Sequence, residues 1–177
     1  MFTPKHASFI ALPLLATMTG ISPAETPHLG KPLDEAAIVA WDISILPDGT
    51  GLPKGSGTAA QGAAIYADKC ALCHGDNGKG GHANALVSDA KIDGISASQK
   101  TIRNFIGDST TIFDFIRRAM PFQAPRSLSD NEVYALTAYI LAENKLIGAN
   151  DVMNAETLPK VKMPNRDNFI IRFPDRI

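Results

Sequence analysis

The sequence predicts a small all-α domain flanked by two irregular arms. Residues 59–69, 111–120 and 130–144 have helical patterns, whereas residues 25–57 and 145–177 contain several prolines and no sustained period. With 177 residues, the chain is long enough to bury one good core. We therefore expect a single domain, residues 58–144, with an arm on each side.

The first helix is predicted by its start signal and its composition. Thr58 and Gln61 have the spacing of a capping box, and residues 59–69 are good helix formers without proline. The helix is expected to run directly into Cys70, and the glycine-rich segment 75–94 is expected to be a loop.

Two further helices follow from apolar periodicity. The second is expected near Thr111 and should end before Pro121, because proline disfavours helical backbone in the preceding residue. The third is opened by a second capping box, Ser129 with Glu132. The apolar positions at helical spacing are Ile112, Phe115, Ile116 and Ala119 in the second helix, and Val133, Leu136, Ile140 and Leu141 in the third.

The two arms are predicted to lie on the domain without cores of their own. Residues 41–45 alternate apolar and polar side chains, and turn signals follow at Pro47, Asp48 and Gly49. Trp41 either packs the arm against the domain or docks a partner, and packing is favoured because a large buried ring usually serves a core.

Residues 1–24 have the pattern of a secretory signal peptide. Lys5 precedes an apolar stretch, residues 7–20, and Ala24 ends a run of small residues suited to cleavage. An uncleaved anchor is the alternative, but about 14 helical residues reach only ~21 Å, short of the ~30 Å hydrocarbon core. We expect an exported, periplasmic protein with no membrane span in its mature form.

Charge and cysteine content narrow the possible functions. The net charge of −1 gives no reason to expect nucleic-acid binding. Cys70 and Cys73 are the only cysteines, so an exported chain of this length has no disulfide framework unless they pair with each other.

The segment Cys70-Ala71-Leu72-Cys73-His74 is a C-x-x-C-H motif, the attachment signal for c-type haem. Residues three and four apart share one helix face, so two thiols and an imidazole can meet one flat macrocycle. A redox C-x-x-C pair would need a βαβ context, and a structural zinc site would need four ligands, so both alternatives are weaker. The sequence predicts one covalent haem c held by Cys70 and Cys73, with His74 on the iron.

Methionine or histidine must supply the second axial ligand, since the motif uses both cysteines. Met120 is the expected ligand because it lies between two packed helices, where it can be held rigidly. The other candidates are His28, His82, Met153 and Met163. His/Met ligation raises the reduction potential and leaves no open iron position, so such a haem passes electrons and does not transform substrates.

The chain resembles class I cytochrome c over residues 55–144. The matching residues are Gly62, Tyr66, Leu86, Met120, Pro121, Leu136 and Tyr139. The resemblance implies that the first and last helices cross closely at Gly62. A proline common in the family is replaced here by Asn84, whose carbonyl can still orient the His74 imidazole.

A narrower resemblance, to the cytochrome subunits of sulfite and sulfane dehydrogenases of bacterial sulfur oxidation, extends into both arms. It is carried by residues 41–43, 47–53, 117–122, 132–139 and 163–167. It implies electron donation by a molybdenum-cofactor dehydrogenase subunit and a downstream cytochrome as acceptor. The alternative is a free periplasmic shuttle, and a haem peroxidase fits less well because only one attachment motif is present.

The sequence leaves the roles of two groups of residues undecided. Arg117 and Arg118 either contact a haem propionate or a partner, or belong to a solvated helix face. The apolar arm residues are candidates for partner contact, namely Trp41, Ile43, Phe169 and Ile171.

Overall fold

The computed structural model describes residues 29–91 and 99–170. The predicted signal peptide, His28 and Ile171 lie outside the described residues. Of the helices in these two ranges, none combines the length and apolarity that crossing a membrane demands.

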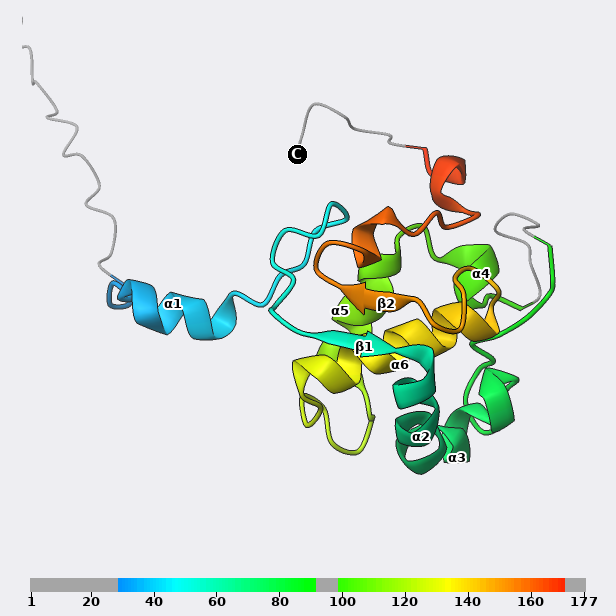
Figure 1. Ribbon diagram of the computed structural model, residues 1–177. Helices are drawn as coiled ribbons and strands as arrows, with labels where there is room; N and C mark the ends of the chain where they lie inside the picture. The colour runs from blue at the N-terminus through cyan, green and yellow to red at the C-terminus, as the bar shows by residue number, and fades with distance from the viewer. Residues whose placement is uncertain (1–28, 92–98, 171–177) are drawn as a thin grey trace, which may run out of the picture.

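The described chain is mostly helical, as predicted, with one small two-stranded sheet (Figure 1). The helices are α1 (Glu35–Trp41), α2 (Ala59–Lys69), α3 (Ala71–His74), α4 (Ile102–Phe105), α5 (Ser109–Ala119) and α6 (Asp130–Glu143). The strands are β1 (Ser56–Thr58) and β2 (Val152–Asn154), and single 3₁₀ turns span Asp76–Gly78, Leu158–Lys160 and Arg166–Asn168.

The three predicted helices are confirmed as α2, α5 and α6. Both capping boxes are present: Thr58 N–H donates to Gln61 Oε1 at 2.9 Å, and Ser129 N–H donates to Glu132 Oε2 at 2.8 Å. Because these boxes satisfy backbone donors left free at a helix start, they fix where α2 and α6 begin. Helix α5 ends at Ala119, before the Met120-Pro121 pair, as expected.

Helices α2 and α6 cross in direct contact at Gly62. A Cβ atom added at Gly62 would lie 2.0 Å from the carbonyl oxygen of Ala135, so only glycine allows this approach. Beside the crossing, the Tyr66 and Tyr139 rings pack with centroids 4.9 Å apart. The crossing implied by the cytochrome resemblance is confirmed, and it forms one wall of the core.

The two arms meet in a strand pair that the sequence did not predict. Strand β1 precedes α2 and pairs antiparallel with β2, with Gly57 opposite Met153. Three side chains of the second arm, Met153, Leu158 and Met163, are buried in the core shared with α5 and α6. The second arm therefore completes the domain's core.

The first arm differs from its prediction in two ways. It contains the helix α1, capped by Asp34, whose Oδ1 accepts from Ala37 N–H at 2.7 Å. Helix α1 projects away from the domain (Figure 1), and Trp41 at its end is 81% exposed. The packing interpretation of Trp41 is therefore wrong, because no core surrounds the ring in the described residues.

Candidate haem site

One short stretch of backbone carries both cysteines and His74. Cys70 N–H donates to Tyr66 O at 2.9 Å at the end of α2, and His74 N–H donates to Cys70 O at 3.0 Å within α3. The thiols and the imidazole are thus presented from positions 70, 73 and 74, at the three- and four-residue spacing that the motif predicted.

The four predicted site residues line one apolar cavity of about 290 Å³. Cys70, Cys73 and His74 come from the α2–α3 junction, and Met120 comes from the end of α5. The other lining residues are Tyr66, Lys69, His82, Ala83, Leu86, Ile116, Pro121, Phe122, Gln123, Leu128, Leu136 and Ile140. Residues that are 50 positions apart in sequence are brought together here because α6 packs against both α2 and α5.

The competing axial candidates lie elsewhere or on an exposed rim. Met153 and Met163 are buried in the core and do not line the cavity. His82 does line the cavity, but it is exposed and lies in the loop that follows His74. Met120 is the described methionine that reaches the cavity.

The His74 imidazole is oriented by the backbone of its own loop. Its Nδ1 lies 3.0 Å from the carbonyl oxygen of Asn84. A carbonyl only accepts hydrogen bonds, so Nδ1 carries the proton and Nε2 is left with its lone pair free to bind a metal. The expectation that the Asn84 carbonyl orients the His74 imidazole, in place of the proline common in the family, is confirmed.

The environment of Cys70 disfavours a redox role for this residue. Both thiols are free, and burial raises the pKa of Cys70 to about 11. Redox-active pairs instead have an attacking thiol with a lowered pKa. Cys70 therefore stays protonated at neutral pH, unlike such an attacking thiol.

Two tyrosine hydroxyls donate hydrogen bonds to the loop after His74, which also carries Asn84. Tyr66 donates to the Gly75 carbonyl at 3.0 Å, and Tyr139 donates to Asn77 Oδ1 at 3.1 Å. Burial raises the pKa of Tyr66 to about 12, so the hydroxyl remains a donor at neutral pH. The α2–α6 crossing is thereby tied to the segment that follows His74.

Three side-chain contacts of Lys69, Arg117 and Arg118 join different elements and were not predicted from the sequence. Lys69 Nζ lies 3.4 Å from Glu132 Oε1 and ties α2 to the start of α6. Arg117 Nε lies 3.2 Å from Asp130 Oδ1. Arg118 Nη2 donates to the Ile43 carbonyl at 2.9 Å, so this arginine holds the first arm on α5.

The donor set of the cavity fits a c-type haem. Apolar walls suit a macrocycle, two neighbouring thiols can form thioethers, and an imidazole nitrogen and a thioether sulfur can bind iron. Cys70 and Cys73 would hold the haem covalently, and His74 and Met120 would be the axial ligands. The haem would supply an iron centre that takes up and gives back one electron.

Comparison with known proteins identifies the family of the chain. The family model described as cytochrome c oxidase, cbb3-type, subunit III matches residues 57–140. A chain in the crystal structure of the sulfane dehydrogenase SoxCD from Paracoccus pantotrophus matches with a TM-score of 0.76 and 35% identity, over 85% of this chain and 75% of that one. The chain therefore belongs to the class I c-type cytochromes, which are electron-transfer proteins rather than enzymes.

Two curated relatives match over shorter shares of their length. Thiosulfate dehydrogenase of Stutzerimonas stutzeri is 30% identical over 137 residues, which are 70% of this chain and 42% of the relative. The cbb3-type cytochrome c oxidase subunit FixP of Azorhizobium caulinodans is 38% identical over 92 residues, which are 50% of this chain and 28% of the relative. The chain thus spans less than half the length of either protein.

Proposed function

We propose that this protein is a monohaem c-type cytochrome that accepts electrons one at a time from a periplasmic molybdenum sulfite or sulfane dehydrogenase. Cys70 and Cys73 attach a single haem c, and His74 and Met120 are its axial ligands. A downstream cytochrome then accepts the electrons from this haem.

The convergence of these four residues on one apolar cavity is the observation that carries the electron-transfer role. The Asn84 carbonyl accepts a hydrogen bond from Nδ1 of His74, which leaves Nε2 available to bind iron. The end of helix α5 presents Met120. When both axial positions are filled, no site is open for oxygen or peroxide, so electron transfer is the chemistry that remains.

The extent of the structural similarity supports the partner. The haem domain, residues 58–144, is about half of the chain, whereas the likeness to the SoxCD chain covers 85% of it. The likeness therefore includes much of the two arms, of which the second also completes the domain's core. We infer that the arms serve the association with the molybdenum-containing donor.

Export is part of the same proposal. Residues 1–24 form the signal peptide, residues 25–57 and 145–177 are the arms, and the mature protein works in the periplasm. A covalent haem and a partner of the Sox type both suit an exported protein.

A free periplasmic shuttle without a permanent partner is the second candidate. One observation favours the subunit over the shuttle: in the described residues the first arm exposes Leu33, Ile38, Val39 and Trp41. A soluble carrier that meets its partners briefly has no need of such a surface.

Two measurements test the proposal. Intact mass of periplasmic material should give a chain starting near Glu25 plus one haem. Mixed with the purified molybdenum subunit and sulfite or a sulfane substrate, the cytochrome should become reduced. A mass without haem would refute the cofactor assignment, and no reduction by any sulfur substrate would favour the shuttle.

A further inference from the structure

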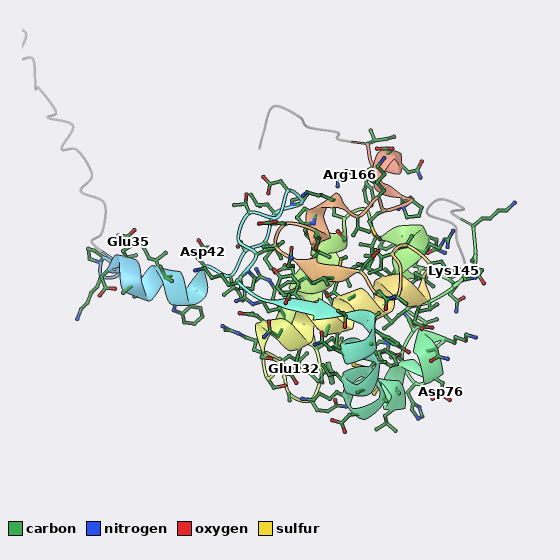
Figure 2. The ribbon with its side chains drawn as sticks, in the orientation of Figure 1. Glu35, Asp42, Asp76, Glu132, Lys145 and Arg166 are labelled. Carbon is green, nitrogen blue, oxygen red and sulfur yellow. The ribbon has the colours of Figure 1, made fainter. Side chains whose placement is uncertain are left out.

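Helix α1 presents an apolar surface that its own domain does not cover. Leu33 before the helix and Ile38, Val39 and Trp41 within it are all exposed, and Trp41 is 81% exposed. The helix between the labelled Glu35 and Asp42 stands clear of the domain (Figure 2). This cluster, Leu33, Ile38, Val39 and Trp41, is here called the α1 patch.

Helices as short as α1 are not stable on their own. It has seven residues, and isolated helices shorter than about 12 residues are marginal in water. Tertiary packing of an apolar face normally provides the missing stability. A short helix with exposed apolar side chains is therefore built to be covered by something other than its own domain.

The arm that carries α1 is anchored to α5, the helix that leads into the cavity residue Met120. Arg118 donates to the carbonyl of Ile43, two residues after Trp41, and its Nε pairs with Asp114 at 2.7 Å. Arg118 precedes the cavity residue Met120 by two positions. Whatever binds α1 is thus linked through this anchor to α5, whose end presents Met120 to the cavity.

We infer that α1 is a docking helix that inserts the α1 patch into an apolar groove of the electron donor and holds that donor beside the haem edge. This inference rests on the proposed function, because the donor is the molybdenum-containing subunit assigned there. Recognition is of the helix-in-groove kind, with Trp41 as its large anchoring side chain.

Charge disfavours a lipid surface as the occupant. The charged residues around the patch are Lys31, Asp34, Glu35 and Asp42, so acidic groups outnumber basic ones. Helices that bind in the membrane interface instead carry lysine and arginine to meet anionic lipids.

Area disfavours a second copy of the chain that meets α1 through its own α1. Two paired seven-residue helices bury far less than the ~1,200 Å² typical of a stable interface. A donor that contacts both α1 and the haem domain buries a larger area, and it must approach the haem in any case to deliver electrons.

The double variant Ile38→Ser/Trp41→Ala tests the inference in the full-length holoprotein. Affinity for the purified molybdenum subunit should fall by about tenfold or more, as expected for loss of an anchoring tryptophan. The haem spectrum should be unchanged, and the rate of reduction should recover at saturating donor. Val152→Thr, at an exposed apolar residue of β2, is the matched control and should bind like the wild type.

The outcomes separate this inference from the proposed function. Wild-type reduction with equal affinity of wild type and double variant would overturn the docking role alone. Absence of reduction even for the wild type would overturn both. Binding of the wild type to phosphatidylcholine–phosphatidylglycerol vesicles, or a dimer in light scattering that the double variant dissolves, would assign α1 to a membrane or a second copy and overturn the inference.

Discussion

The His74 ring and the Asn84 backbone are joined by a hydrogen bond of 3.0 Å between Nδ1 and the carbonyl oxygen. The bond uses the main chain, so the Asn84 side chain, which is exposed, is free to vary. Substituting this side chain should therefore leave the orientation of the imidazole unchanged.

Asn84→Pro should keep the haem spectrum and raise stability. The carbonyl remains, and proline removes backbone freedom from the unfolded chain, which is worth roughly 0.4–1 kcal/mol where the native backbone accepts it. Thermal unfolding of the holoprotein measures the change, with Asn84→Gly as the opposite control. A changed methionine or histidine ligation signature in Asn84→Pro would contradict the expectation.

Gly62→Ala should destabilise the fold by about 1–3 kcal/mol or more, the usual range for overpacking. The added Cβ would lie 2.0 Å from a backbone atom of α6, so the two helices must move apart. Ala64→Ser on the exposed side of α2 is the control, and it should change the free energy of unfolding by less than about 0.5 kcal/mol. Equal stability of the two variants would show that the crossing is looser than the structure indicates.

Helices α2 and α6 were predictable from signals close to them in the sequence, whereas the strand pair was not. The capping residues Thr58 and Ser129 lie within three positions of their partners, so α2 and α6 were predicted to within a residue. Strands β1 and β2 have three residues each and lie almost a hundred positions apart. No periodicity is visible in so short a strand, and the pairing depends on the finished core.

In the candidate site, too, some features were predictable from the sequence and others were not. Its four residues were predicted from the C-x-x-C-H motif and from the Met-Pro pair that follows a predicted helix. In the structure all four line one cavity. The anchor of the first arm, from Arg118 to the Ile43 carbonyl, joins residues 75 positions apart and has no signature in the sequence. The predicted packing of Trp41 against the domain was wrong for a related reason. A large aromatic ring in a sequence does not indicate which surface, if any, it packs against.

Glu132→Gln should reduce the loss of stability that acid causes. Hydrogen bonds from the Ser129 backbone and hydroxyl, aided by Lys69, hold the pKa of Glu132 below its ordinary value of 4.5. A lowered pKa in the folded state stabilises above the unfolded-state pKa, and that contribution is lost as pH falls through the folded-state pKa. Unfolding between pH 6 and about 3 should therefore depend less on pH in the variant. The exposed Glu156→Gln control should follow the wild-type curve.

The second arm should tolerate truncation only beyond its core residues. Deletion from Val161 onward removes Met163, which is 4% exposed in the core, and Asn165, whose Nδ2 donates to the Phe105 carbonyl at 2.7 Å. That deletion should lower the melting temperature as well as any affinity for the donor. Deletion from Phe169 onward spares both contacts, so it should leave the melting temperature nearly unchanged and is the better test of partner binding.

Met120→Ala and Met163→Ala should separate ligation from packing. Met120 lines the cavity, so its loss should open the sixth iron position, end the methionine-ligand signature of the low-spin haem and let small ligands bind. Met163 is buried in the core outside the cavity, so its loss should cost roughly 2–5 kcal/mol of stability and leave the haem spectrum unchanged. Absorbance spectra with and without an added small ligand, together with thermal unfolding, measure both effects. If Met163→Ala alone abolished the methionine signature, the axial assignment would pass from Met120 to Met163.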